Sequence, residues 1–311
     1  MNQLNSSPLT IACAADDAFA MPMAVMLHSA LKNISSDQQV CIFAVDGGIK
    51  ESNKKKILES LGNKSVVFNW IKAPDSLPDN LPIAKDVQPH LNKSTYYRLM
   101  LARILPNEVN KLIYLDSDLV ILGDLNELWA TEIGDNYVMA AQDCGVPFVS
   151  SPYGIKKYEE LHILSDQKYF NAGVLVMNIA KWRSEEIDIK LFQYLEKYRT
   201  DVQHHDQEAM NAVFTGKWGE ISPQWNQTPL VFGYSSWKES PYQELDYDNA
   251  INNPYIVHFA SNAKPWNSFE KHPLRDLFFN YLDMTAWSGW RLNFRRRLQR
   301  KVARAFQQLA I

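Results

Sequence analysis

Short strand-like runs alternate with helical segments along the first quarter of the chain. Strand-like runs occupy residues 9–15, 40–45 and 65–71, and helix-like segments occupy residues 22–31 and 51–61. This alternation predicts βαβ units, in which short buried strands form a mostly parallel sheet covered by helices on both faces. Because the chain has 311 residues and 46% of them are hydrophobic, we expect one large α/β domain with a substantial core.

Further elements are predicted along the next part of the chain. A capped helix is expected to begin at Ser94 and end at Pro106, and a buried strand follows at residues 111–115. Later strands and helices are predicted at residues 137–141, 171–178, 187–199 and 206–214, with a loop rich in Gly, Pro and Ser at 145–154. Residues 222–253 lack clear periodicity, so they either line a binding cleft or form loops over the core.

Charge is distributed unevenly, although the formal net charge is only −3. This small net charge implies no nucleic-acid or membrane partner by itself. Seven basic residues lie between Arg291 and Arg304, which leaves a net charge of about −10 for the rest of the chain by formal counting. Because apolar residues recur every three or four positions from Trp287 to Leu309, residues 285–311 are predicted to form a basic amphipathic helix after a domain at 1–284.

The three cysteines, Cys13, Cys41 and Cys144, are an odd number and lie far apart. Two of them occur in apolar strand-like runs, so we expect buried, reduced thiols, which are typical of a cytoplasmic protein. The N-terminal segment has neither the basic flank nor the apolar run of a signal peptide, and no stretch approaches a membrane-spanning length. We therefore expect a protein that stays in the cytosol.

The strand at residues 111–115 leads directly into Asp116, Ser117 and Asp118. In an extended chain, residues i and i+2 point to the same side, and the carboxyl ends of strands in an open α/β sheet are where ligands bind. Two carboxylates on one side form half of a Mg²⁺ or Mn²⁺ site that a diphosphate would complete. The Asp-x-Asp pattern alone is a weak signal, because such pairs also occur in turns and helix caps.

A histidine and a lysine near the C-terminus suit the same chemistry. His258 ends an apolar strand, and Lys264 follows in a polar loop. An imidazole suits Mn²⁺ or Zn²⁺, and an ammonium group suits phosphate. Each also has an ordinary explanation, because strand-end histidines are often structural and loop lysines are usually solvated.

Two polar pairs complete the candidate set. Asn171 and Gly173 open a strand, where a glycine permits close approach of the backbone to a ligand. Asp206 and Gln207 offer a carboxylate and an amide at the start of a helix. A turn would also explain the first pair, and a helix cap would explain the second.

Taken together and in order, these segments resemble glycosyltransferase family 8, and most of all its bacterial lipooligosaccharide α-galactosyltransferases and lipopolysaccharide α-glucosyltransferases. The matching segments are IACAADDAF, STYYRLMLARILP, KLIYLDSDLVILGDLNELW, YFNAGVLVMNIAKW, HHDQEAMNAVFTGKW, VHFASNAKPW and the basic C-terminal tail. They cover nearly the whole chain. Seven ordered segments are far more specific than any one of them, so the ordinary explanations above lose most of their weight.

The resemblance implies a GT-A fold, a Rossmann-like sheet that binds a UDP-sugar. It also implies Mn²⁺, with Mg²⁺ as the alternative, bridging the diphosphate. By this resemblance Asp116, Asp118 and His258 are the metal ligands, and Lys264 contacts the diphosphate. These side chains agree in type with the chemistry inferred from the residues alone.

The resemblance also assigns the remaining substrate contacts. Uridine would lie against Ala14, Ala15, Asp16 and Phe19, with Asp16 accepting a hydrogen bond from uracil. The donor sugar would be held by Arg98, Asn171, Gly173, Asp206 and Gln207, and Ser117, Ala172 and Ser261 complete the predicted substrate contacts. In this family the new bond keeps the donor's α configuration. Gln207 is then the amide beneath the anomeric carbon and Asp206 the carboxylate beside it, so these two are the predicted catalytic residues.

Three positions depart from the pattern of the bacterial galactosyltransferases. Ala18 stands where an asparagine is common, and Phe19 replaces a tyrosine. Phe19 can still stack on uracil, but a hydroxyl and an amide contact are lost. Ser261 stands where a glycine is usual, close to the diphosphate. We therefore expect an altered nucleotide affinity.

The sequence thus predicts a metal-dependent, retaining hexosyltransferase that moves galactose or glucose from UDP to a glycan or glycolipid acceptor of the lipopolysaccharide type. The alternatives are a self-glucosylating primer enzyme, a non-catalytic nucleotide-sugar-binding or assembly protein and, more remotely, a metal-dependent nuclease or phosphatase. The complete set of metal and diphosphate ligands argues against a protein that has lost turnover. No nucleic-acid partner is expected.

The basic tail has two interpretations. It is expected to bind an anionic membrane surface, on the inner face of the cytoplasmic membrane, because the acceptors of such relatives are lipid-anchored glycans. Alternatively, its apolar stripe packs on the acidic body of the protein or on a partner.

Overall fold

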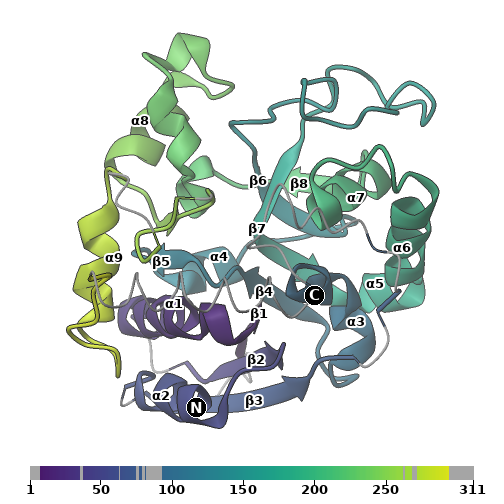
Figure 1. Cartoon of the computed structure of the whole chain (residues 1–311). Helices are drawn as coiled ribbons and strands as arrows, with labels where there is room; N and C mark the ends of the chain where they lie inside the picture. The colour runs from purple at the N-terminus through teal and green to yellow at the C-terminus, as the bar shows by residue number, and fades with distance from the viewer. Residues whose placement is uncertain are drawn as a thin grey trace, which may run out of the picture.

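A seven-stranded sheet organises the molecule (Figure 1). The computed structural model describes residues 8–35, 38–62, 64–74, 77–78, 81, 93–261, 263–267 and 272–293. The strands of the sheet are β1 (Leu9–Ala15), β2 (Val40–Asp46), β3 (Val66–Lys72), β4 (Lys111–Leu115), β6 (Val138–Gln142), β7 (Phe170–Asn178) and β8 (Trp218–Glu220). They lie in the order β3-β2-β1-β4-β7-β6-β8, while β5 (Leu119–Ile121) and β9 (Ile256–His258) form a separate pair.

Parallel pairing dominates this sheet. β1 is parallel to β2 and β4, β2 is parallel to β3, and β6 is parallel to β8. β7 is antiparallel to both β4 and β6. The mostly parallel α/β sheet predicted from the sequence is confirmed. The reversed direction of β7 places its first residues at the carboxyl end of β4, which the sequence did not predict.

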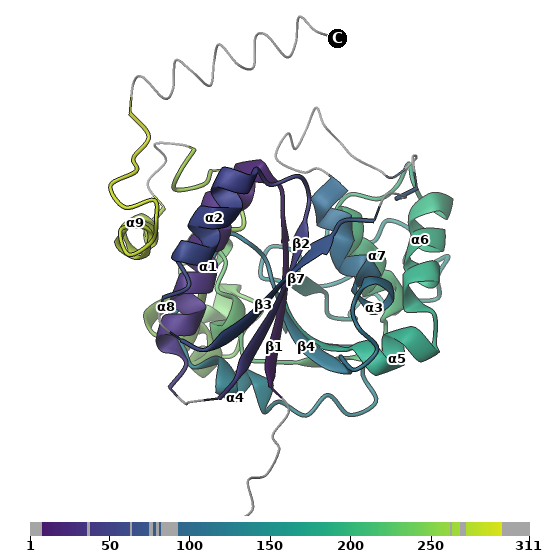
Figure 2. The same cartoon turned by 90° about the horizontal axis from the view of Figure 1, so that it is seen from below.

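Helices cover both faces of the sheet. They are α1 (Ala20–Asn33), α2 (Glu51–Glu59), α3 (Leu101–Ile104), α4 (Leu125–Trp129), α5 (Ile179–Ser184), α6 (Ile187–Lys197), α7 (His205–Val213), α8 (Glu244–Asn252) and α9 (Arg275–Leu282). Seen from below, α1 and α2 lie on one side of β1–β4, and α3, α5, α6 and α7 lie on the other (Figure 2). The helices predicted at 22–31, 51–61, 187–199 and 206–214 are present, with ends shifted by one or two residues.

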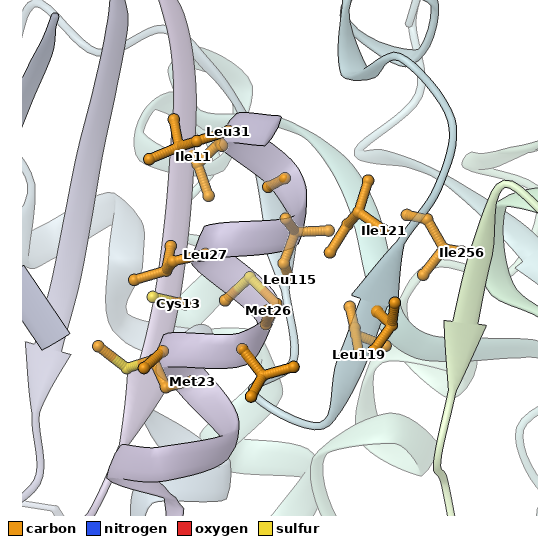
Figure 3. Packing of buried hydrophobic residues seen from close by; sticks show 14 of the residues in the cluster. Ile11, Cys13, Met23, Met26, Leu27, Leu31, Leu115, Leu119, Ile121 and Ile256 are labelled. Atoms are coloured by element: carbon orange, nitrogen blue, oxygen red, sulfur yellow. The ribbon is translucent and has the colours of Figure 1, made fainter. Parts of the chain in front are cut away.

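Two hydrophobic clusters lie on the two faces, and β4 contributes to both. Ile113 and Leu115 belong to the cluster on the α1 side, whereas Leu112 and Tyr114 belong to the other. Side chains of a strand alternate between the faces of a sheet, so a strand covered on both faces is apolar throughout. Figure 3 shows the first cluster, in which side chains of β1, α1, β5 and β9 meet.

The segment expected to form one helix from Ser94 to Pro106 is divided in the structure. A 3₁₀ helix, η2 (Lys93–Met100), precedes the single turn of α3. Because a 3₁₀ helix has three residues per turn, Thr95 and Arg98 lie one above the other, and Arg98 Nε donates to the Thr95 carbonyl at 3.3 Å. The aperiodic segment 222–253 contains 3₁₀ turns and α8, a helix that the sequence did not reveal.

The start of the predicted C-terminal tail packs on the body of the protein. Trp287 is 9% exposed and belongs to the α1-side cluster, and the Ala286 N–H donates to Ser60 Oγ at 3.0 Å. The rest of the predicted amphipathic helix, residues 294–311, lies outside the described residues. Within the part of the chain that is described, none of the helices has the length and apolar character needed to span a bilayer.

Candidate active site

A cavity of about 360 Å³ opens at the carboxyl ends of β1 and β4. The start of β7, the first turn of α7 and the residues after β9 complete its walls. The predicted site residues that line it are Ala14, Ala15, Phe19, Arg98, Asp116, Ser117, Asp118, Asn171, Ala172, Gly173, Asp206, Gln207, His258 and Lys264. The structure therefore brings together side chains that are up to 250 residues apart in the sequence, while Asp16 and Ser261 lie outside this lining.

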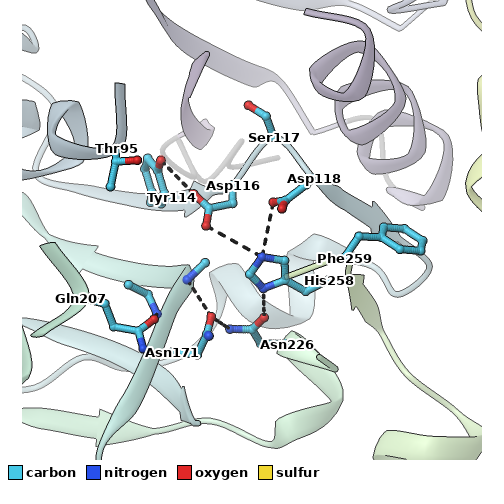
Figure 4. Close-up of polar contacts among 12 residues, drawn as sticks. Thr95, Tyr114, Asp116, Ser117, Asp118, Asn171, Gln207, Asn226, His258 and Phe259 are labelled. Carbon is cyan, nitrogen blue, oxygen red and sulfur yellow. Dashed lines mark hydrogen bonds and ion pairs between the residues drawn. The ribbon is translucent and has the colours of Figure 1, made fainter. Parts of the chain in front are cut away.

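Asp116, Asp118 and His258 form a cluster of possible metal ligands (Figure 4). One donor atom of each lies within 4.8 Å of the others. His258 Nε2 is 3.3 Å from Asp118 Oδ1 and 3.9 Å from Asp116 Oδ2. The histidine arrives there because β9 pairs antiparallel with β5, which starts directly after Asp118, so that Leu119 lies opposite His258. Two carboxylates and an imidazole suit Mn²⁺ or a similar divalent cation.

A buried amide fixes the imidazole of His258. Asn226 is 2% exposed, its Nδ2 donates to Asn171 Oδ1 at 2.9 Å, and its Oδ1 lies 2.8 Å from His258 Nδ1. Because Asn226 Oδ1 can only accept, this network assigns the ring proton to Nδ1. Nε2 then directs its lone pair toward the two carboxylates, which is the arrangement that a metal-binding histidine needs.

Both carboxylates of the cluster have a cationic partner. Arg98 Nη2 lies 2.9 Å from Asp116 Oδ1, and Lys264 Nζ lies 2.5 Å from Asp118 Oδ2. Burial raises the pKa of Asp116 above its usual value, although Arg98 opposes this effect. Burial also acts to raise the pKa of Asp118, but Lys264 and His258 outweigh it and hold that pKa well below its usual range.

Lys264 therefore contacts a candidate metal ligand, Asp118, and also lines the cavity. Its ammonium group also donates to the Phe259 carbonyl at 2.7 Å, and its side chain is only 5% exposed. An ammonium group held this close to a divalent-cation site suits the binding of a diphosphate, whose charge both would share.

Gln207 is held at both ends of its amide. Its Oε1 accepts the Ala172 N–H at 3.0 Å, and its Nε2 donates to Asp143 Oδ2 at 3.2 Å. The neighbouring carboxylate of Asp206 is paired with Arg98, at 2.8 Å between Oδ2 and Nε. Burial raises the pKa of Asp206 to about 6, against the lowering effect of Arg98. The first turn of α7 thus presents a fixed amide and a buried carboxylate to the cavity.

Gly173 leaves room for the imidazole of His258. A Cβ atom at this position would lie 2.3 Å from His258 Cε1 and 2.7 Å from Nδ1. The sequence predicted close approach of the backbone to a ligand here. In the structure the group that approaches this glycine is the ring of a candidate metal ligand, so the absence of a side chain on β7 permits the metal cluster itself.

The nucleotide end of the predicted site lies where β1 meets the Asp116–Asp118 turn. Ser117 Oγ donates to the Ala14 carbonyl at 2.9 Å, which joins the two strand ends. Asp16 Oδ1 accepts the Phe19 N–H at 3.1 Å and so caps a 3₁₀ turn. The expected contacts of Asp16 with uracil and of Ser261 near the diphosphate stay predictions.

Sequence reasoning missed several polar residues of the site. Asp143 accepts hydrogen bonds from Asn171, Gln207 and two backbone amides, and it directly follows β6. Its position after a buried strand is the signal that identified Asp116, so it was open to the same argument. Asn226 and His204 had no such signal, because the first lies in the aperiodic segment and the second precedes a helix.

The family comparison covers most of the chain. Residues 10–270 match the model described as glycosyl transferase family 8. General stress protein A of Bacillus subtilis (strain 168) is 29% identical over 281 residues, which are 89% of this chain and 94% of that protein. Lipopolysaccharide 1,2-glucosyltransferase of Escherichia coli is 25% identical over 275 residues, which are 88% of this chain and 77% of that protein.

Solved structures agree with this match. The galactosyltransferase LgtC, solved in complex with donor and acceptor sugar analogues, is similar with a TM-score of 0.74 and 25% identity, covering 89% of this chain and 96% of that chain. The apo form of the bifunctional glycosyltransferase WbbM has a TM-score of 0.73 at 20% identity, covering 93% of this chain and 52% of that chain, and this likeness concerns the fold alone. The GT-A fold expected from the sequence resemblance is confirmed.

Proposed function

The chain belongs to glycosyl transferase family 8, and we propose that it transfers a hexose, galactose or glucose, from a UDP-sugar to a glycan acceptor of the lipopolysaccharide type, with Mn²⁺ and with retention of configuration. One observation carries this proposal. The Asp116, Asp118 and His258 cluster opens on the same cavity as Lys264, Asp206 and Gln207. A site for the cation and diphosphate therefore adjoins a fixed amide and carboxylate, as transfer from a nucleotide sugar requires.

In the proposed reaction the side chains bind and orient the donor. Asp116, Asp118 and His258 would hold Mn²⁺, or Mg²⁺ in its place, which when bound neutralises the charge of the departing diphosphate. Lys264 would contact the diphosphate from the other side of Asp118. Arg98, Asn171 and the first turn of α7 would hold the donor sugar.

Gln207 would lie beneath the anomeric carbon with its amide fixed by Ala172 and Asp143. A fixed amide stabilises developing positive charge but does not act as a strong nucleophile. We therefore favour a same-face mechanism in which the leaving phosphate takes the proton of the acceptor hydroxyl. The new bond then forms on the face from which UDP leaves, and the α configuration is kept.

Two observations support the proposed acceptor and location. The Escherichia coli relative is named as a lipopolysaccharide glucosyltransferase, and LgtC as a galactosyltransferase. Six basic residues follow Asn293 in the sequence. A cytoplasmic enzyme with such a tail would bind the inner face of the cytoplasmic membrane, where a lipid-anchored glycan is within its reach.

A panel of UDP-sugars tests the proposed donor and stereochemistry. UDP release would be measured with Mn²⁺ and UDP-galactose, UDP-glucose, UDP-N-acetylglucosamine or UDP-glucuronic acid, and the product anomer would be read from its proton NMR coupling constant. We expect release from UDP-galactose or UDP-glucose and an α-linked product. Binding of UDP without turnover of any sugar would favour a non-catalytic binder instead, and a β-linked product would contradict retention.

A further inference from the structure

The turn that carries Gln207 contains a strained residue. His205 is the first residue of α7, and its φ of 50° lies in the left-handed region. A residue with a β-carbon adopts this conformation only at a cost in free energy, so the surrounding contacts must hold it there. Because Asp206 and Gln207 follow directly in the chain, their backbone positions depend on the contacts that keep His205 in this conformation.

A buried carboxylate closes the turn around this residue. Glu208 Oε2 accepts the Gln203 N–H at 2.6 Å and the His204 N–H at 3.2 Å. The backbone N–H of Glu208 donates to the His204 carbonyl at 3.3 Å. The arrangement resembles a capping box, in which a glutamate in the first turn of a helix binds a backbone N–H that precedes the helix. Glu208 therefore bonds, across His205, to the two residues before it.

The neighbouring helix fixes the carboxylate itself. α6 lies beside α7 (Figure 1), and the hydroxyl of Tyr194 in α6 donates to Glu208 Oε1 at 3.1 Å. Both residues are buried, and Glu208 is only 1% exposed. Burial raises the pKa of Glu208, and the hydrogen bonds from the two N–H groups and from Tyr194 oppose this rise. Since both carboxylate oxygens accept hydrogen bonds, the side chain is held in one orientation.

Glu208 is separate from the cavity. Asp206 and Gln207 line the cavity, whereas Glu208 does not. Its oxygens accept from backbone and tyrosine donors, so they are not directed at the place proposed for the donor sugar. Glu208 is consequently not placed to attack the anomeric carbon or to take the proton of the acceptor. Any effect that it has on transfer must pass through the turn.

The body of α7 has an anchor of its own. Asn211 Nδ2 donates to the carbonyls of Gln207 and Phe170 at 2.9 Å, and the Phe170 N–H donates to Asn211 Oδ1 at 2.8 Å. These bonds tie α7 to β7 one turn after Gln207. Loss of the Glu208 carboxylate should therefore change the turn before Gln207 and leave the rest of the helix in place.

We infer that Glu208 is a positioning residue for the transfer reaction and acts through Gln207. Its carboxylate holds the strained turn in the conformation that lets the Gln207 amide bind the Ala172 N–H and Asp143. Without it, His205 could return to an ordinary backbone conformation and the amide would move. A displacement of about 1 Å can lower a rate about 100-fold. The inference rests on the proposed function, because it gives Glu208 a role in that reaction.

Two substitutions of Glu208 separate positioning from direct chemistry. UDP release from the preferred UDP-sugar is measured with Mn²⁺ and with methyl β-galactoside and methyl β-glucoside as acceptor probes. Glu208→Ala should lower kcat about 10- to 100-fold while the affinity for UDP with Mn²⁺ stays within about threefold of wild type. Glu208→Gln should keep kcat within about threefold, because its amide oxygen still accepts from the two N–H groups. If Glu208→Gln were as slow as Glu208→Ala, the charge of the carboxylate would be required, and the inference would be overturned.

A double-mutant cycle tests whether Glu208 acts through Gln207. The substitution Glu208→Ala is introduced into the wild type and into Gln207→Ala, and kcat is compared in each pair. We expect Glu208→Ala to slow the Gln207→Ala protein by no more than about threefold, because the amide that it displaces is already absent. An equal loss in both backgrounds would mean that Glu208 contributes to the fold in general, which would contradict the inference.

Two further variants complete the test. Glu196→Ala is the matched control and should keep the wild-type kcat, because Glu196 is exposed on the helix that supplies Tyr194 and does not line the cavity. If circular dichroism showed that Glu208→Ala does not fold, Tyr194→Phe would take its place in the cycle. It should lower kcat about threefold to tenfold in the wild type and leave kcat unchanged in Gln207→Ala, and equal losses would again overturn the inference. Absence of UDP release from every UDP-sugar by the wild type would instead overturn the proposed function.

Discussion

Asp116 and Asp118 are separated by one residue, yet their surroundings differ. Asp118 lies between Lys264 and His258, which lower its pKa and strongly favour its ionised form over the protonated one. Asp116 is next to Arg98 and accepts from Tyr114 at 3.1 Å, but burial still raises its pKa. A bound metal ion would compensate the negative charge of both carboxylates. We therefore expect the free-energy cost of burying the two ionised groups to be lowest when the cation is bound.

The amide of Gln207 is expected to assist transfer without being indispensable. Gln207→Ala removes one oriented dipole but leaves the metal ligands in place, so we expect the transfer rate to fall by roughly one to two orders of magnitude. Single-turnover kinetics with a saturating UDP-sugar measure this change. Gln39→Ala is the control, because Gln39 is exposed and precedes β2. Complete loss of transfer with intact UDP-sugar binding would favour a covalent role for this residue.

Asp206 is expected to set an acidic limit on activity. Burial raises its pKa to about 6, so its carboxylate becomes protonated as the pH falls through this value. Protonation removes the negative partner of Arg98 Nε, and we expect kcat/KM to decline below about pH 6. The measurement is a pH profile between about pH 5 and pH 8. In Asp206→Asn the decline of kcat/KM below about pH 6 should disappear. If the variant showed the same decline, the ionisation responsible would belong to another group.

At the scale of elements, the close contact between β7 and β9 makes the metal cluster possible. Gly173→Ala would place a Cβ 2.3 Å from His258 Cε1, and the imidazole must move because the central strand cannot. We expect the affinity for Mn²⁺ to fall about 10- to 100-fold, as for the loss of a group that orients a metal ligand. Electron paramagnetic resonance titration of free Mn²⁺ measures this affinity without an activity assay.

Gly233 provides a matched glycine for this test. No atom lies within 4 Å of a Cβ built at Gly233, and the residue does not line the cavity. Gly233→Ala should therefore keep the affinity of the wild-type protein for Mn²⁺. Equal affinity in Gly173→Ala and Gly233→Ala would mean that the position of the imidazole does not decide binding.

The sequence predicted the elements whose patterns are local. β4 was identified because a strand buried on both faces has an uninterrupted apolar sequence. The Asp116–Asp118 turn was identified because ligands bind at the carboxyl ends of strands in such sheets. The antiparallel direction of β7 was not predicted, since an apolar run has no preferred direction. Asn226 was missed for a related reason: its role depends on contacts with Asn171 and His258, and each of these is more than 30 residues away.

At the scale of the whole molecule, we expect the basic tail to bind an anionic membrane while its first residues stay packed on the body. Trp287 and Ala286 pack on the body, so a truncation that removed them would disturb the core. Ending the chain after Asn293 instead removes six basic residues and keeps these contacts. We expect this shortened protein to lose sedimentation with phosphatidylglycerol vesicles, because each basic residue near an anionic surface contributes about 1 kcal/mol.

Two comparisons complete that experiment. The full-length protein should not sediment with pure phosphatidylcholine vesicles, and both proteins should release UDP at the same rate from a soluble acceptor mixture. If the shortened protein sedimented with anionic vesicles as fully as the whole chain, the tail would not be the membrane-binding element. Packing of the tail on the protein or on a partner would then be the better explanation.

The central claim is that this protein is a metal-dependent UDP-sugar transferase built around Asp116, Asp118 and His258. The most direct test is UDP release from the preferred UDP-sugar during a Mn²⁺ titration, comparing the wild type with Asp118→Ala. We predict release that saturates with Mn²⁺, is abolished by a chelator and falls at least about 100-fold in the variant. Release that is independent of the metal, or equal in the two proteins, would contradict the account.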